Sequence, residues 1–302
     1  MKKRIIIGIL SAVIMMTAII GPVIVQAKRV ENTPYLALGA DLSDEQRAVV
    51  LELLDVDTSN MDIYTITEVT NAQEHEYLGS YLDASVIGSR SLSSVKVTGR
   101  EDGYGIQIRT ENITYCTEGM YQNALATAGV EDADVVVVAP VPISGTAALV
   151  GAMKAYETMT GKVIKPELAD GATNELVVTG KLAEVLGDSD KAEEFIAAVK
   201  EVISANEFET EDDILKAIED IAADLDIELS DEDKAMILSL MQKLSKLDLD
   251  FDKIKEQAGE LYNRISNMDL SQYGITEERV QSFWEELSSF FTDLFSKIKE
   301  MI

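Results

Sequence analysis

The order of strand-like and helix-like segments in the first half of the chain limits its fold more than any other feature. Four segments have the apolar alternation or the apolar runs of β-strands: residues 61–69, 91–98, 104–110 and 134–141. Helical patterns at residues 71–83 and 113–128 lie between them, and the glycine-bounded loop at residues 99–103 predicts a hairpin. This βαββαβ order predicts an α+β fold, a ferredoxin-like sandwich with additional helices.

Capping signals place further helices around this unit. Residues 28–40 are predicted as an extended lead-in, followed by a helix whose capping box is Ser43 with Gln46. Asn71 with Glu74 is predicted as a second capping box, at the start of the helix at residues 71–83. Another helix, at residues 145–160, directly follows the last strand.

Beyond Lys162 the sequence has no strand pattern. Helical patterns continue at residues 166–186, 189–205, 210–225, 231–247, 252–268 and 277–301. An acidic loop at residues 207–213 is a natural hinge between the two kinds of sequence. We therefore predict an α+β domain at residues 28–205 and an acidic, all-α C-terminal region at residues 206–302.

The N-terminus has the layout of a bacterial secretory signal peptide. Lys2, Lys3 and Arg4 precede an uncharged apolar run at residues 5–25, and Ala27 ends a cleavage-site pattern. We expect cleavage after Ala27 and a protein that is extracellular or held at the cell surface. The alternative is an uncleaved anchor, because the run is long enough for a bilayer that needs roughly 20 residues.

Charge and cysteine content exclude several classes of protein. The chain has 54 acidic and 26 basic residues, a formal net charge of −28. Binding to nucleic acid or to anionic lipid through phosphates needs clustered Lys and Arg, so we expect neither. Cys116 is the only cysteine, which makes an internal disulfide impossible, so stability must come from a hydrophobic core.

The most enzyme-like feature is the link from the strand at residues 134–141 into the following helix. Ser144, Gly145 and Thr146 place two hydroxyls and free backbone N–H groups at the helix start, where an anion such as phosphate or a carboxylate can bind. The alternative is structural: Ser144 caps the helix, and the small residues after it pack on the sheet. No lysine follows Gly145, so the segment is not a Walker A loop.

Other catalytic or metal-binding groups are sparse. His75 is the only histidine, and a nucleophilic pair with Cys116 is conceivable but unexpected, because Cys116 lies on the apolar side of its helix. The acidic run that begins at Asp248 lacks the glycine and the final glutamate of a calcium-binding loop. We expect no catalytic residues, no metal site and no cofactor.

The last helix is the best candidate for docking to a partner. Its apolar residues follow a heptad seam, and the candidate docking residues are Phe283, Trp284, Leu287, Phe291, Leu294 and Ile298. The alternatives are that this helix packs into its own domain or lies on the membrane interface, which its acidic polar side disfavours. We expect membrane contact only if the signal is uncleaved or if this helix docks.

Several motifs together resemble a known family. They are NITY at residues 112–115, MYQNAL at 120–125, TAGV at 127–130, AP at 139–140 and SGTAAL at 144–149. The chain resembles, over about residues 38–255, the YpuA-like family of exported Gram-positive proteins of unknown function. The resemblance implies an exported, envelope-associated protein and supplies no catalytic residues.

These observations favour a non-enzymatic binding or scaffold module of the cell envelope, with a possible protein partner at the C-terminal helix. The alternative is a small-molecule (anion) binding protein or enzyme that uses the helix start at Ser144, Gly145 and Thr146.

Overall fold

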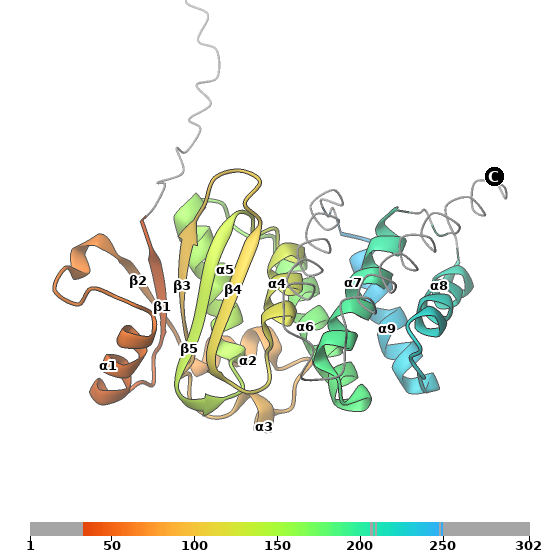
Figure 1. Ribbon diagram of the computed structural model, residues 1–302, viewed down its shortest axis with the longest axis horizontal. Helices are drawn as coiled ribbons and strands as arrows, with labels where there is room; N and C mark the ends of the chain where they lie inside the picture. The colour runs from red at the N-terminus through yellow and green to blue at the C-terminus, as the bar shows by residue number, and fades with distance from the viewer. Residues whose placement is uncertain (1–32, 206–207, 209, 248, 250–302) are drawn as a thin grey trace, which may run out of the picture.

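The computed structural model describes residues 33–205, 208, 210–247 and 249, which form one mixed β-sheet and a set of helices (Figure 1). The strands are β1 (Tyr35–Gly39), β2 (Thr65–Val69), β3 (Ser94–Gly99), β4 (Ile106–Ile113) and β5 (Ala133–Ile143). Their order across the sheet is β2-β1-β3-β5-β4. The predicted α+β class is confirmed.

The helices have the following bounds: α1 (Asp44–Leu53), α2 (Asn71–Leu78), α3 (Ala84–Ile87), α4 (Glu118–Thr127), α5 (Thr146–Thr160), α6 (Pro166–Leu186), α7 (Ser189–Ala205), α8 (Glu211–Asp224) and α9 (Asp231–Leu244). A short 3-10 turn, η1, spans Met61–Ile63. The capping box of Ser43 and Gln46 at α1 is confirmed. The one predicted at Asn71 is wrong by one residue, because Thr70 is the N-cap of α2 and Gln73 its partner.

The sheet differs from the ferredoxin-like prediction in two ways. Residues 35–39, expected as a lead-in, form β1, which is buried throughout and pairs with β2 and β3. The predicted hairpin between β3 and β4 is wrong, since β5 lies between these strands, antiparallel to β3 and parallel to β4. The valine-rich β5 is largely buried, which suits an inner position, whereas β4 carries exposed Arg109 and Glu111.

Side chains of α4 cover the free edge of β4. Glu118 Oε1 accepts a hydrogen bond from the Thr110 N–H at 3.0 Å, and Gln122 Nε2 donates to the Ile106 carbonyl at 2.9 Å. Backbone groups at a sheet edge otherwise invite pairing with another chain. The buried side chain of Gln122 is therefore explained by its hydrogen bond to β4. The two α4 side chains occupy backbone groups that the edge strand β4 would otherwise leave unpaired.

Two main cores lie on either side of α6. Its Ala172 and Leu176 pack with α2, α4, α5 and the sheet, whereas its Val178 and Leu182 pack with α7, α8 and α9. A smaller apolar cluster lies under α1 on the opposite face of the sheet. The helical core thus begins within α6, and the division of the chain at residue 205 stays a prediction.

Three predicted segments fall outside the described residues. They are the signal peptide with its cleavage site at Ala27, and the helices at residues 252–268 and 277–301, including the docking residues Phe283 to Ile298. Within the described ranges, no helix is long and apolar enough to cross a membrane.

Candidate ligand-binding pocket

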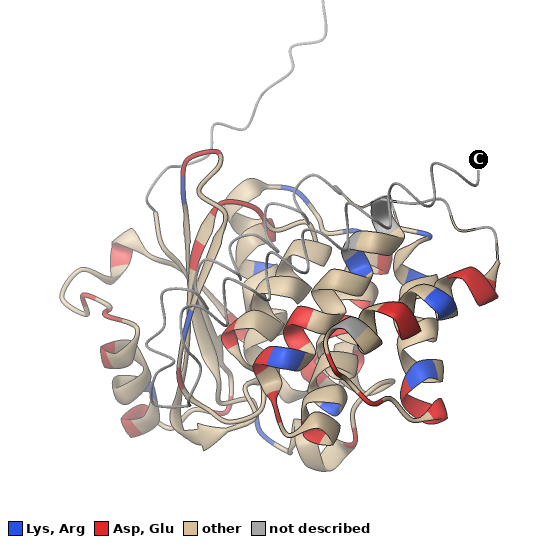
Figure 2. Cartoon of the chain, turned by 45° about the vertical axis from the view of Figure 1, so that its right-hand side comes forward, with Lys and Arg blue, Asp and Glu red and all other residues tan. Residues whose placement is uncertain are grey.

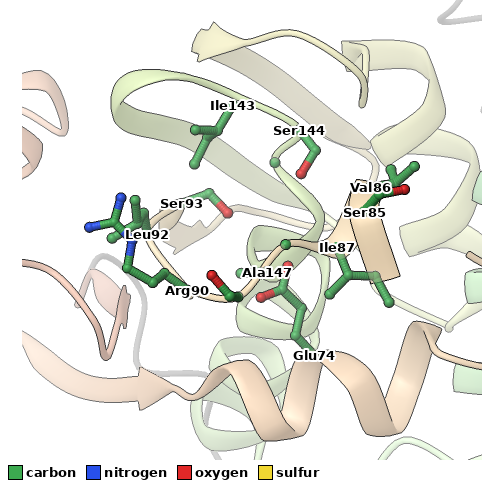
Figure 3. Close-up of a pocket in the computed structure, with 13 residues that line it drawn as sticks. Glu74, Ser85, Val86, Ile87, Arg90, Leu92, Ser93, Ile143, Ser144 and Ala147 are labelled. Atoms are coloured by element: carbon green, nitrogen blue, oxygen red, sulfur yellow. The ribbon is translucent and has the colours of Figure 1, made fainter. Parts of the chain in front are cut away.

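A pocket of about 290 Å³ lies beside the start of α5 (Figure 3). Three segments form its walls: α2, residues 85–93 around the end of α3, and the turn from β5 into α5. The polar side chains that line it are Glu74, Ser85, Ser89, Arg90, Ser93 and Ser144. Val86, Ile87, Leu92, Ile143 and Ala147 supply an aliphatic lining. We refer to this cavity as the α5 pocket.

The turn into α5 has a backbone geometry that favours glycine. Gly145 is the N-cap of α5 with a φ of +91°, in the left-handed region that other residues rarely adopt. Its carbonyl accepts a hydrogen bond from the buried Tyr121 hydroxyl at 2.6 Å. A Cβ at this position would lie 2.5 Å from that hydroxyl, so glycine is also required by close packing.

The predicted trio of Ser144, Gly145 and Thr146 lies only partly in the lining of the pocket, although Ser144 Oγ is 3.3 Å from Thr146 Oγ1. Ser144 and Gly145 line the pocket, whereas the buried Thr146 donates its hydroxyl hydrogen to Glu74 Oε1 at 2.5 Å. Ser144 does not cap α5, because no side chain makes a cap hydrogen bond there. That part of the structural alternative is therefore wrong. Anion binding by the trio stays a prediction.

Ser93 lies at the same helix start. Its hydroxyl oxygen accepts a hydrogen bond from the Ala148 N–H at 3.1 Å, and the same N–H also donates to the Gly145 carbonyl at 3.0 Å. In Figure 3 the hydroxyls of Ser93 and Ser144 lie on the Ile143 side of the cavity, across from Glu74. The helix start therefore presents hydroxyl groups together with backbone N–H groups.

Glu74 is a candidate site residue that was not identified from the sequence. It is only 2% exposed although it is ionisable, and its carboxyl group points from α2 toward the start of α5 (Figure 3). From the sequence, Glu74 was predicted to be a capping residue, but the N-cap is Thr70 and its capping partner is Gln73, so the Glu74 side chain turns inward. The available signal was its spacing of four from Leu78, which places a glutamate on the apolar face of α2.

The environment of Glu74 disfavours its charged form. Burial raises the pKa of this carboxyl above its ordinary value of 4.5, although hydrogen bonds from Thr146 and Asn71 and the nearby His75 act in the opposite direction. Asn71 Nδ2 is 3.4 Å from Glu74 Oε2, a weak contact. Within the described part of the chain, no lysine or arginine forms an ion pair with Glu74.

We expect Glu74→Gln to stabilise the free protein in a pH-dependent way. Well below pH 4.5 the carboxyl is neutral in both folded and unfolded chains, so the melting temperatures of the variant and the parent should converge as the pH falls. As the pH rises toward the raised folded pKa, the unfolded chain ionises first and the parent loses stability. The variant does not share this loss. Melting temperatures from pH 4 to pH 8 test this, with exposed Glu76→Gln as control, and a difference that does not change with pH would contradict it.

His75 and Cys116 do not form a catalytic pair in this arrangement. His75 Nε2 lies 3.2 Å from the carbonyl oxygen of Gly88, so this contact connects α2 to the segment at residues 85–93 that lines the α5 pocket. Burial raises the pKa of the Cys116 thiol to about 12, which leaves almost no thiolate at neutral pH. In the described ranges, no group of three or more His, Cys, Asp or Glu side chains could hold a metal ion.

We expect Cys116 to be inert in the folded protein. A thiol reagent such as Ellman's reagent should react with it only after unfolding in urea, because the thiol is buried and protonated. The measurement is the absorbance released with and without denaturant. Rapid stoichiometric reaction in buffer would show that the thiol is accessible and ionised.

Comparison with known proteins gives a family. The family model described as a protein of unknown function (DUF1002) matches residues 38–261, which include every residue of the α5 pocket. The chain is 35% identical to the uncharacterized protein YpuA of Bacillus subtilis (strain 168) over 297 residues, 98% of this chain and 98% of that protein. No solved structure matches the chain. The resemblance inferred from the motifs is confirmed.

Proposed function

The chain belongs to the DUF1002 family of proteins of unknown function, and from that premise we propose that it is an exported cell-envelope protein that binds a small polar molecule in the α5 pocket. Its role is that of a binding module, and the pocket holds the ligand without transforming it.

The observation that carries this proposal is the convergence of polar groups on one cavity. Glu74 comes from α2, Ser93 and Arg90 from the segment that leads into β3, and Ser144 from the turn into α5. Aliphatic side chains line the rest of the cavity. A concave, partly apolar site with a few polar groups from separate segments is typical of small-molecule binding.

Export rests on the N-terminal sequence. The basic residues 2–4, the uncharged run and the pattern that ends at Ala27 match a secretory signal, and the acidic chain suits a protein that must stay soluble outside the cell. A protein partner at the C-terminal helix, through the residues around Trp284 and Phe291, belongs to the same proposal. Comparing the mass of the exported protein with that of the precursor tests cleavage, and a full-length species in the membrane fraction would contradict it.

An enzyme is the second candidate, and Glu74 is the observation that favours it. A buried carboxyl with a raised pKa in a cavity is a common form of general acid or base. Neither Cys116 nor His75 is placed to act as a nucleophile beside Glu74. The Cys116 thiol is buried and protonated, and His75 Nε2 contacts the Gly88 carbonyl. We therefore rank binding first.

Blocking the pocket tests the proposal. A library of small neutral, cationic and anionic molecules should produce chemical-shift changes in the amide NMR signals of the residues that line the α5 pocket. Ser89→Trp, at the exposed rim, should abolish these changes, whereas Ser80→Trp, an exposed serine that does not line the pocket, should keep them. Binding by none of the three chemical classes, or binding unaffected by Ser89→Trp, would contradict a role for this pocket.

A further inference from the structure

The described part of the chain treats its two most deeply buried glutamates differently. Glu175 is fully buried and forms an ion pair with Lys200, whose Nζ is 2.6 Å from Glu175 Oε1. Glu74 is 2% exposed and has only neutral hydrogen-bond donors, Thr146 and Asn71. Buried charges are normally paired because leaving water is costly for an isolated carboxylate. Glu74 differs from Glu175 in a second respect, since it lines a cavity.

We propose that the α5 pocket binds a small zwitterion of the amino-acid class, with the ammonium group against Glu74 and the carboxylate group against the start of α5. This inference rests on the proposed function and adds the chemical class of the ligand.

The ammonium group of the proposed ligand is inferred from Glu74, whose hydrogen-bond donors Thr146 and Asn71 are both neutral. An ammonium group has three donors and no acceptor, so it can donate to Glu74 Oε2, which has only the 3.4 Å contact with Asn71, and to serine hydroxyls of the lining. A divalent metal ion fits less well, because Ca²⁺ takes six to eight oxygen ligands and usually several carboxylates. The net charge of −28 also attracts cations, and Figure 2 shows Asp and Glu residues spread along the helices and loops of the chain.

The carboxylate half follows from the other side of the cavity. Gly145 and Ala147 line the pocket at the start of α5, where backbone N–H groups and the helix dipole favour an anion. Arg90 adds a guanidinium group to the lining, and Figure 3 shows it beside Leu92, on the side of the pocket away from Ser144. A simple anion would gain these contacts but would face the carboxylate of Glu74. A zwitterion satisfies both ends.

The size of the cavity is consistent with this class. A volume of about 290 Å³ is at the lower end of typical ligand pockets, which run from roughly 300 to 1,000 Å³. It accommodates a molecule of the size of an amino acid. The aliphatic side chains of Val86, Ile87 and Leu92 are available for a side chain of the ligand.

Calorimetric titration of the purified full chain with each of the standard amino acids tests the proposal. Each binder is compared with its N-acetyl derivative, which lacks the ammonium charge, and with its amide, which lacks the carboxylate. We expect at least one amino acid to bind below about 10 mM and both derivatives to bind at least tenfold more weakly, since a charged hydrogen bond contributes about 1.5–3 kcal/mol. Inorganic phosphate serves as the anion-only probe.

Glu74→Gln separates the charge of Glu74 from its shape. This variant keeps an acceptor for Thr146 and should reduce amino-acid affinity by about 10- to 100-fold, whereas Glu76→Gln on the exposed side of α2 should leave it unchanged. Glu74→Gln should also abolish proton release on binding. In the parent protein, an ammonium group lowers the raised pKa of Glu74, so calorimetry above pH 4.5 in two buffers of different ionisation enthalpy should detect released protons.

The outcomes are separable from those of the proposed function. No binding by any amino acid, equal binding of the N-acetyl derivatives, or unchanged affinity in Glu74→Gln would overturn the zwitterion proposal. Tighter binding of phosphate than of amino acids would also overturn it and would favour the anion site predicted from Ser144, Gly145 and Thr146. In each case, binding of another polar molecule that Ser89→Trp blocks would leave the proposed function intact.

Discussion

Replacing Lys200 by methionine is expected to lower the free energy of unfolding by about 3–5 kcal/mol. Lys200 is 2% exposed on α7, and its ammonium group donates to Glu175 Oε1 at 2.6 Å, to Thr127 Oγ1 at 3.2 Å and to the Asn123 carbonyl at 3.5 Å. Glu175 also accepts a hydrogen bond from the Thr127 hydroxyl. Methionine keeps the length of the side chain but leaves Glu175 charged, buried and without a cation.

Urea denaturation of the variant at pH 7 measures this loss. Lys234→Met is the matched control, because Lys234 forms an ion pair with Glu219 at 2.8 Å but the two side chains are 28% and 46% exposed. Exposed pairs contribute about 0–1 kcal/mol, so the control should change little. Equal effects of the two substitutions would show that Glu175 is not desolvated in the folded protein.

The double variant Glu175→Leu with Lys200→Met should recover most of the stability that Lys200→Met loses. Removing both charges also removes the desolvation cost, and apolar replacements of buried ion pairs are often neutral or stabilising. The coupling energy from the double-mutant cycle should therefore be large, while additive losses would contradict this account. The network joins α4, α6 and α7, so its loss should loosen the contact between the two cores.

Gly145→Ala is expected to destabilise the protein by about 2–5 kcal/mol. A non-glycine residue in the left-handed region costs about 1–2 kcal/mol, and forcing a methyl group into a packed site adds about 1–3 kcal/mol. The added Cβ would meet the Tyr121 hydroxyl at 2.5 Å and Ile113 Cγ2 at 2.6 Å. The clash also separates Tyr121 from the Gly145 carbonyl and distorts the wall of the α5 pocket.

Gly129→Ala is the control for Gly145→Ala. Gly129 has a similar φ of +83°, but a Cβ there has no neighbour within 4 Å, so only the conformational cost of about 1–2 kcal/mol applies. The difference between the two variants in thermal or urea unfolding measures the cost of the close packing. If Gly145→Ala were as mild as Gly129→Ala, the contact with Tyr121 would be absent.

The sequence predicted local structure well where a short-range signal exists. Ser43 and Gln46 act within one turn, and their capping box is confirmed. The strands β2, β3, β4 and β5 were recognised from sequence patterns of seven to nine residues. Tyr35–Gly39 was missed because a strand buried on both faces has no alternation, and its length is too short for a longer pattern to compensate.

Strand pairing was harder to predict than strand position. The loop between β3 and β4 has the composition of a hairpin, yet these strands do not pair, because β5 arrives about 35 residues later and fits between them. Only the whole sheet determines which strand is covered on both faces. The residues of the loop indicate that the chain turns there, but they do not indicate whether β3 pairs with β4 or with β5.

The residues of the α5 pocket also differ in how far the sequence predicted them. Ser144 and Gly145 were identified because the step from a strand to a helix is visible in the sequence, and both line the cavity. Glu74 was not identified, because its role depends on the approach of α2 to α5, which brings Thr146 to its carboxylate across 72 positions of the chain. A one-residue error in the cap of α2 was enough to hide it.

By itself, the sequence determined the α+β class, the acidic character, the absence of a disulfide and membership of the family, since all of these follow from composition, local periodicity or motifs. The tertiary structure alone decided the strand order, the ion pair of Glu175 with Lys200 and the cavity beside Glu74. The physical reason is that burial and pairing depend on which distant segments meet. A carboxylate has an ordinary pKa in an extended chain, and only packing removes its water and leaves it facing a pocket without a counter-charge.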